Sequence, residues 1–229
     1  RAEHEAKHAE NYRINSFHLG EGSPKQKFRA NMDAIYTLKT LENQHRDATP
    51  EEQETLANYV GWGGLADAFD AEKAAWTGEY KELKAALTEE EYAAARASTL
   101  NAHYTSPTVI RAIYEALDGM GFEKGNILEP SMGVGNFFGM LPDSMLGSRL
   151  YGVELDSITG RIAQKLYPQA EIKVAGFETT DRRDFYDLAV GNVPFGNYRV
   201  SDKPYDKLGF SIHNYFFAKA LDQVRPGGI

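Results

Sequence analysis

Two kinds of hydrophobic periodicity divide this sequence near residue 100. Before it, apolar residues recur every three or four positions, the spacing of one buried helix face. Within residues 25–46 these positions are Phe28, Met32, Ile35, Leu38 and Leu41. After it, short apolar runs alternate with helical patterns, which is typical of a parallel α/β sheet. The pattern predicts a helical module over 25–100 and an α/β domain over 101–229.

The N-terminal part contains clear helix starts. Thr49 precedes a proline, and Thr88 precedes three glutamates, so each threonine is placed to cap a helix. Residues 1–24 are polar and predict an extended arm or linker. We expect the helices at 25–46, 50–60, 67–86 (in several pieces) and 89–98.

Three glycines surround a tryptophan in Gly61-Trp62-Gly63-Gly64. Such a segment turns sharply beside a large ring. Two interpretations stay open at this stage. It is either a packing corner between helices or a docking surface for the second domain or for DNA.

The C-terminal part predicts a doubly wound parallel sheet. Its strands are expected at 126–130, 150–155, 171–175 and 186–191, with helices at 107–120, 135–141, 157–167 and 212–224. The final residues, Pro226-Gly227-Gly228-Ile229, predict a turn and the first residue of another strand. We therefore expect the sheet to be incomplete at the C-terminus.

Composition narrows the class of protein. The 229 residues are 42% apolar and 25% charged, as in ordinary globular proteins. There is no cysteine, which excludes disulfides and cysteine-ligated metals. No metal-ligand motif, signal peptide or membrane-length apolar run is present, so we expect a cytoplasmic protein that binds no metal or membrane. The net charge of −8 argues against strong non-specific nucleic-acid binding by this chain alone.

A glycine loop follows the first predicted strand, in Glu129-Pro130-Ser131-Met132-Gly133-Val134-Gly135. Ligands of open α/β sheets bind at the carboxyl ends of the strands. Glycines allow close approach of the backbone, and the following helix offers N–H groups. Glu154 ends the next strand, about 20 residues further on, where a carboxylate can bind ribose hydroxyls. A structural turn, with Asp156 as a helix cap and Glu154 in solvent, is the alternative.

Polar and aromatic residues also follow the third and fourth predicted strands. Phe177 is placed to lie against a flat heterocycle, and Glu178 to reach an exocyclic amine. Asn192-Val193-Pro194-Phe195 combines an amide, a proline-constrained turn and an aromatic ring. Such a group suits a planar amine, for example a base flipped from a duplex. The alternative is a turn in which Asn192 satisfies its own backbone and Phe195 is part of the core.

Four segments, taken in this order, resemble S-adenosylmethionine-dependent DNA methyltransferases of the N6-adenine type. They are His103-Tyr104-Thr105-Ser106-Pro107, the loop from Glu129 to Gly135, Glu154 with Phe177, and Asn192 to Phe195. The chain more narrowly resembles the methylase region of large helicase–methylase polyproteins of conjugative elements and phages. That resemblance implies a Rossmann-like methyltransferase sheet, DNA as a partner, and a helicase region in the same polypeptide.

The resemblance implies S-adenosyl-L-methionine as the cofactor. The implied cofactor contacts are Tyr104, Thr105, Pro107, Glu129, Pro130, Gly133, Gly135, Glu154, Phe177 and Glu178. Tyr104, Thr105 and Pro107 match a segment at the methionine end of the cofactor. The residues from Glu129 to Gly135 match the loop beneath the methionine and ribose. Glu154 matches the acid on the ribose hydroxyls, and Phe177 matches the residue that packs on the adenine. Gly176 departs from the family, whose members often have an aspartate there, and Glu178 is a candidate substitute.

Asn192, Val193, Pro194 and Phe195 match a catalytic motif that usually reads N-P-P-F/Y or D-P-P-Y. The resemblance implies a flipped adenine stacked on Phe195, with its amine donating to the Asn192 side chain and the Val193 carbonyl. Val193 departs from the first proline of the motif. The expected activity is therefore methylation of adenine N6 in DNA. Two alternatives stay open: a module that binds cofactor or DNA without catalysis, and a methyltransferase with a protein glutamine or RNA target. A dehydrogenase is disfavoured because the loop lacks G-x-G-x-x-G.

Overall fold

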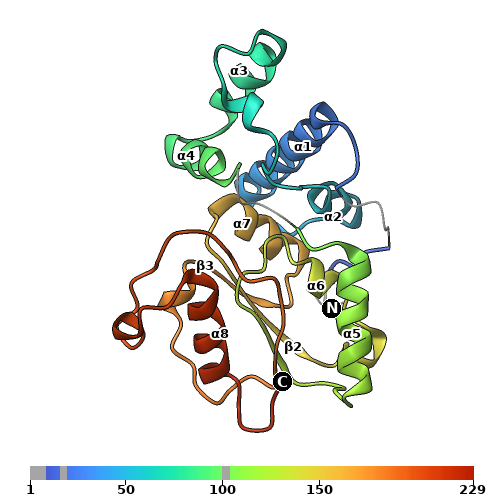
Figure 1. Ribbon diagram of the computed structural model, residues 1–229. Helices are drawn as coiled ribbons and strands as arrows, with labels where there is room; N and C mark the ends of the chain where they lie inside the picture. Colours follow the sequence, from blue (N-terminus) through green and yellow to red (C-terminus); the bar gives the residue numbers. More distant parts are fainter. Residues whose placement is uncertain (1–8, 16–19, 100–103) are drawn as a thin grey trace, which may run out of the picture.

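The computed structural model describes residues 9–15, 20–99 and 104–229 and shows a helical part beside an α/β part (Figure 1). The helical part consists of α1 (Pro24–Asn43), α2 (Pro50–Ala57), the 3₁₀ turns η1 (Ala66–Phe69) and η2 (Ala74–Trp76), α3 (Thr77–Ala86) and α4 (Glu89–Ser98). Capping boxes begin α1, α2 and α4 at Ser23, Thr49 and Thr88. Helix α1 ends before the predicted residue 46, since His45 has a left-handed φ of 49°.

Trp62 forms the packing corner that was one of the two interpretations of its glycine-rich segment. Its side chain is 1% exposed and makes edge contacts with Phe28, Tyr59 and Phe69. Asn31 on α1 holds the chain beside it, because its side chain donates to the Gly61 carbonyl and accepts from the Val60 N–H. The glycine-rich segment therefore connects helices inside the core.

The α/β part contains a four-stranded, fully parallel sheet in the order β3-β2-β1-β4. Its strands are β1 (Asn126–Glu129), β2 (Arg149–Glu154), β3 (Glu171–Val174) and β4 (Leu188–Ala189). The strand order reverses at β1, which places a ligand-binding crevice between β1 and β4. The prediction of an α/β fold with a parallel sheet preceded by helices is confirmed.

Strand β4 is shorter than the predicted range 186–191. Only Leu188 and Ala189 pair with β1, whereas Tyr186 forms an isolated bridge with Val224. On the other side of β4, the Ile229 N–H donates to the Asp187 carbonyl and the Ala189 N–H donates to the Ile229 carbonyl. This alternation is the hydrogen-bond pattern of a parallel ladder. Beyond β4, Gly191 has a φ of 153° that takes the chain out of the sheet.

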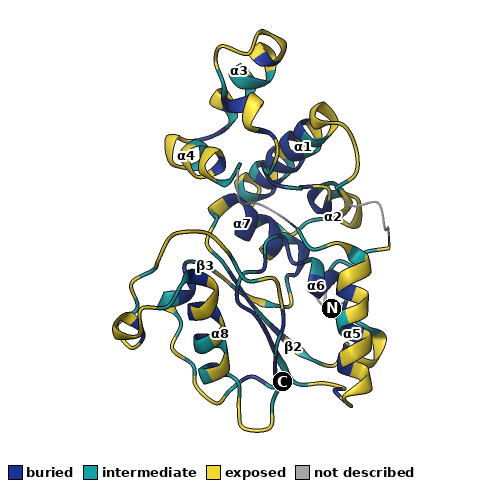
Figure 2. Ribbon diagram, viewed as in Figure 1, coloured by how far each residue is buried: buried dark blue, intermediate teal, exposed yellow. Residues whose placement is uncertain are grey.

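Helices cover both faces of the sheet. The remaining elements are α5 (Pro107–Gly119), α6 (Asn136–Gly139), η3 (Asp143–Met145), α7 (Ser157–Leu166), η4 (Phe177–Thr179), η5 (Asp206–Leu208) and α8 (Ile212–Gln223). Ile127 packs with α5, α6 and α7, whereas the next residue, Leu128, packs with α8. This alternation follows from the period of two along a strand. Figure 2 shows the buried strands between α5 and α8, whose outer sides are exposed.

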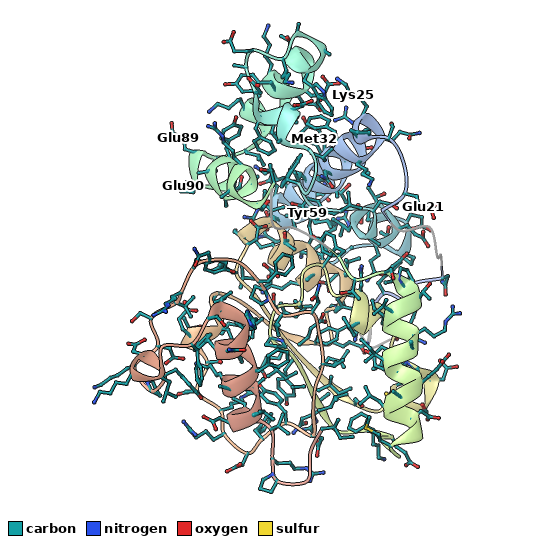
Figure 3. All side chains as sticks on the ribbon, viewed as in Figure 1. Glu21, Lys25, Met32, Tyr59, Glu89 and Glu90 are labelled. Carbon is teal, nitrogen blue, oxygen red and sulfur yellow. The ribbon has the colours of Figure 1, made fainter. Side chains whose placement is uncertain are left out.

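One apolar cluster continues from the helical part into the α/β part, because buried side chains of α1 and α2 join those of α5 and α7. Gln53 of α2 donates to the Leu166 carbonyl at the end of α7, and Lys165 donates to the Arg46 carbonyl. In Figure 3 Tyr59 lies at the boundary between the two parts. The two-domain division with its boundary at residue 100 stays a prediction.

Residues 9–15 of the predicted N-terminal arm are extended on the α/β part. The Tyr12 N–H donates to the Leu166 carbonyl and the Ile14 N–H to the Gly139 carbonyl. Arg13 donates to the Leu141 carbonyl at 2.5 Å. The rest of the arm before residue 20 lies outside the described residues. Among the helices that the structure describes, none has the length and hydropathy needed to cross a bilayer.

Candidate functional site

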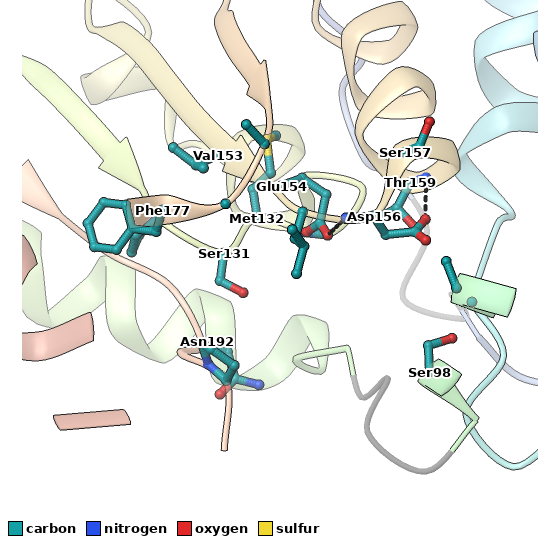
Figure 4. Close-up of a pocket in the computed structure, with 18 of the residues that line it drawn as sticks. Ser98, Ser131, Met132, Val153, Glu154, Asp156, Ser157, Thr159, Phe177 and Asn192 are labelled. Carbon is teal, nitrogen blue, oxygen red and sulfur yellow. Dashed lines mark hydrogen bonds between the residues drawn. The ribbon is translucent and has the colours of Figure 1, made fainter. Parts of the chain in front are cut away.

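A cavity of about 910 Å³ lies at the carboxyl ends of all four strands (Figure 4). Residues after β1, β2, β3 and β4 line it, including Ser131, Glu154, Phe177 and Asn192. This is the position that the strand order predicts for a ligand. Its volume is near the upper end of the usual range for small-molecule sites, about 300–1,000 Å³.

The glycine loop lies under this cavity in a conformation that requires its glycines. Gly133 has a φ of 56°, and a Cβ there would lie 2.7 Å from the Tyr104 ring. Gly135 has a φ of 85° and is the N-cap of α6, where a Cβ would lie 2.5 Å from the Tyr167 ring. Gly133 lines the cavity, whereas Gly135 is buried beneath it. Of these two glycines, only Gly133 is therefore placed to contact a ligand.

Glu154 holds the glycine loop in place. Its carboxylate accepts from the Gly133 N–H and the Asp156 N–H, each at 2.8 Å. Burial raises the pKa of Glu154 to about 7, although these two hydrogen bonds oppose the effect. Each carboxylate oxygen can accept a further hydrogen bond, so Glu154 has capacity for a ligand hydroxyl.

Asp156 caps α7, as expected if this segment is a structural turn. Its side chain accepts from the Thr159 N–H at 2.8 Å. The other half of that alternative is wrong, because the Glu154 carboxylate bonds the glycine loop rather than solvent alone.

Glu129 is the most deeply buried acid of the cavity, with 2% of its surface exposed. Its Oε2 atom has no hydrogen-bond partner among the residues that the structure describes. Burial, and next the charge of Glu154, raise the pKa of Glu129 well above its usual range. The adjacent Pro130 also lines the cavity.

The residues after β3 are arranged differently from the sequence expectation. Phe177 reaches the cavity but is 2% exposed, and its ring packs on Phe216 with centroids 5.0 Å apart. The Glu178 carboxylate folds back against Gly176, into the space that a side chain at 176 would occupy. The acid group of Glu178 thus lies where the Cβ of an aspartate at position 176 would lie in related proteins.

The segment Asn192-Val193-Pro194-Phe195 forms the opposite rim of the cavity. The Asn192 side chain is exposed and bonds no other residue in the described part of the chain, so it does not satisfy its own turn. Val193 packs at the edge of the apolar cluster around α8. Phe195 is 51% exposed, so it is not part of the core.

The predicted segment before α5 is only partly described. Tyr104 and Thr105 line the cavity, whereas Pro107 is the first residue of α5 and does not. Burial raises the pKa of Tyr104 well above its usual value, so its hydroxyl stays protonated. His103, which belongs to the same matched segment, lies outside the described residues.

The helical part supplies a wall of the cavity that the sequence did not predict. Tyr59 and Gly61 line it from the corner, and α4 contributes Thr88, Glu90, Ala94 and Ser98. Arg161 on α7 holds α4 there, because it pairs with Glu91 at 3.0 Å. The small residues along one side of α4 were the only available signal, and they do not identify a ligand site by themselves.

These residues fit S-adenosyl-L-methionine on their donor and acceptor chemistry. Acceptor capacity at Glu154 suits ribose hydroxyls, and Glu178 suits an amine. The unpartnered buried oxygen of Glu129 suits a cationic group. S-adenosyl-L-methionine held by these residues would supply an electrophilic methyl group.

Two proteins of other organisms are similar in sequence to this chain, and one of them is a methyltransferase. The chain is 34% identical over 92 residues to the type II methyltransferase M.CvrRI of Paramecium bursaria Chlorella virus XZ-6E, covering 40% of this chain and 24% of that protein. It is 29% identical over 215 residues to Defense against restriction protein B of Escherichia phage P1, covering 91% of this chain and 8% of the phage protein. The chain thus spans a minor part of both relatives. No family model matches the sequence.

A solved structure of a Listeria monocytogenes protein, described as a class I S-adenosylmethionine-dependent methyltransferase, has a partly similar shape. It aligns with a TM-score of 0.45 and 13% identity, over 89% of this chain and 72% of that one. The likeness is too weak to add to the argument from sequence and site geometry.

Proposed function

We propose that this chain carries the cofactor and target sites of an S-adenosyl-L-methionine-dependent methyltransferase that modifies the N6 amine of adenine in DNA. One observation carries the proposal. Asn192 lies on the rim of the same cavity that contains Glu154 and the glycine loop. One edge of the sheet therefore brings the Asn192 amide into the same cavity as the carboxylate and the loop that we propose hold the cofactor.

The residues of the rim orient a planar amine. The Asn192 side-chain carbonyl and the Val193 main-chain carbonyl accept its two hydrogens, which directs the nitrogen lone pair away from them. Phe195 offers a partly exposed ring face for a flipped base. Catalysis of this kind consists of positioning and electrostatic stabilisation.

Val193 supports the turn in a different way from the proline of related motifs. Its side chain packs against the cluster that contains Leu128, Ile212 and Phe216. This contact restrains the turn by packing rather than by a ring in the backbone. We propose that the turn remains suitable for transfer.

DNA and a helicase region of the same polypeptide are the proposed partners. The segment after Phe195 contains exposed Arg199, Lys203 and Lys207, none of which forms an ion pair with a residue that the structure describes. A buried ion pair of 2.6 Å between Lys219 and Asp202 holds this segment on α8. Unpaired cations beside the target site suit a phosphate backbone.

Asn192→Ala tests the proposal. We expect methyl transfer from labelled cofactor to adenine-containing DNA to fall by about 100-fold or more, since the amine loses its main acceptor. Cofactor affinity should stay within about twofold, because Asn192 bonds no part of the glycine loop. Asn197→Ala, an exposed amide on the same segment, is the matched control. Loss of cofactor binding, or unchanged transfer, would contradict the assigned role.

The second candidate is a module that binds the cofactor without catalysis, and the departure at Val193 favours it. It predicts normal cofactor affinity and no transfer to DNA. Val193→Pro separates the two, since recovery of transfer only in that variant would identify a catalytically weakened site. Parallel assays with RNA and with a glutamine-containing protein test the remaining substrate classes.

A further inference from the structure

The cavity is strongly acidic. Among the residues that the structure describes, the charged ones that line it are Glu90, Glu91, Glu129, Glu154, Asp156, Glu178 and one cation, Arg161. Arg161 is already paired with Glu91 and Glu42. A surface of this charge attracts cationic ligands. Acidic clusters are common on proteins, however, so the surroundings of each acid must show which one contacts a cationic ligand.

Glu129 differs from the other acids of the cavity. It is 2% exposed, and its Oε2 atom has no partner in the part of the chain that the structure describes. Gly191 packs against the side-chain methylene groups of Glu129. A Cβ atom at position 191 would lie 3.2 Å from the Glu129 Cγ. An unpaired carboxylate in such a place is costly, so the group is neutral unless a cation accompanies it.

Within residues 9–15, 20–99 and 104–229, the groups that face Glu129 offer no compensating cation. Glu154 approaches from β2, Tyr114 from α5, and Tyr167 from the end of α7. No Lys or Arg of the described ranges forms an ion pair with it. Burial, followed by the charge of Glu154, raises its pKa.

We propose that Glu129 recognises positive charge in the ligand: it is protonated in the empty site and releases that proton to solvent when a cationic ligand enters. The inference rests on the proposed function. S-adenosyl-L-methionine carries a sulfonium charge that its demethylated product, S-adenosylhomocysteine, lacks. Glu129 therefore distinguishes cofactor from product by charge and favours release of the product.

Comparing proton release by the cofactor with proton release by the product separates the contribution of Glu129 from that of Glu154. Both ligands carry the same ribose, so any proton released by hydrogen bonds to Glu154 is common to both. Below the pKa of Glu129, affinity for the cofactor should rise by about tenfold per pH unit, because binding then requires loss of one proton. Affinity for the product should rise less steeply.

Titration calorimetry tests the proposal. Cofactor and product are each titrated at pH 6.5 in two buffers that differ in ionisation enthalpy, which gives the number of protons released. We expect the cofactor to release about one proton more than the product. Glu129→Gln should abolish this difference and reduce the preference for the cofactor by about tenfold. Glu89→Gln removes an exposed acid from α4 that does not line the cavity, and it should change neither quantity.

Glu129→Asp retains a carboxyl group and should retain part of the difference in proton release, which separates loss of charge recognition from misfolding. Equal proton release by the two ligands in the unmodified protein would overturn the inference and leave the proposed function intact. A difference that persists in Glu129→Gln would also overturn it. If neither ligand binds, the proposed function fails together with the inference.

Discussion

At the scale of single residues, Glu154 connects the loop that follows β1 with the loop that follows β2. It accepts from the backbone after β1 at Gly133 and from its own loop at Asp156. The same carboxylate faces the cavity. It therefore shapes the glycine loop and also offers acceptors to a ligand.

Glu154→Ala should weaken binding of S-adenosyl-L-methionine by about 10- to 100-fold, or about 1.4–2.8 kcal/mol. Both the ribose acceptor and the support of the Gly133 N–H are lost. Calorimetry measures the change. Glu171→Ala, which removes an exposed acid from β3, should leave the affinity unchanged. Equal affinities for Glu154→Ala and the unmodified protein would remove Glu154 from the site.

Local sequence predicted the ends of β1, β2 and β3 to within one residue, and also the glycine loop, because strand, turn and cap signals act over a few residues. It could not predict that Glu178 folds against Gly176, since that contact depends on a side-chain rotamer. Nor could it predict that Phe177 would be almost fully buried by Phe216 of α8, nearly 40 residues away. Contacts of this range follow from tertiary packing.

Arg161 controls how α4 is placed, at the scale of secondary-structure elements. It lies on α7 and pairs with Glu42 of α1 at 2.8 Å and with Glu91 of α4 at 3.0 Å. Lys39 of α1 also pairs with Glu91, at 3.1 Å. Burial alone would raise the pKa of Glu91, but hydrogen bonds from Thr88, Arg161 and Lys39 outweigh it and lower the pKa. Three helices thus meet at one carboxylate beside the cavity.

Arg161→Met should loosen α4 without unfolding the sheet. We expect faster hydrogen exchange across α4, and a loss of stability of about 1–3 kcal/mol, because a partly buried ion network loses its central cation. Arg96→Met changes an exposed arginine on α4 itself, and it serves as the control. Unchanged exchange in α4 would show that apolar packing alone holds the helix in place.

At the scale of the whole molecule, the helical part and the α/β part share one apolar cluster and together line the cavity. The sequence predicted both parts from their periodicities. It did not predict that α4 lines the cavity, because that depends on how Arg161 and the end of α7 dock against helices more than 60 residues away. A ligand that fills this cavity would contact both parts, so its bound position tests the fold and the site together.

The most direct measurement is a crystal structure of the protein with S-adenosyl-L-methionine bound. We predict that the ligand lies in the cavity with its ribose on Glu154 and its sulfonium beside Glu129. Its methyl group should be directed toward Asn192. Binding at another surface, or in this cavity with the methyl group directed away from Asn192, would contradict the account.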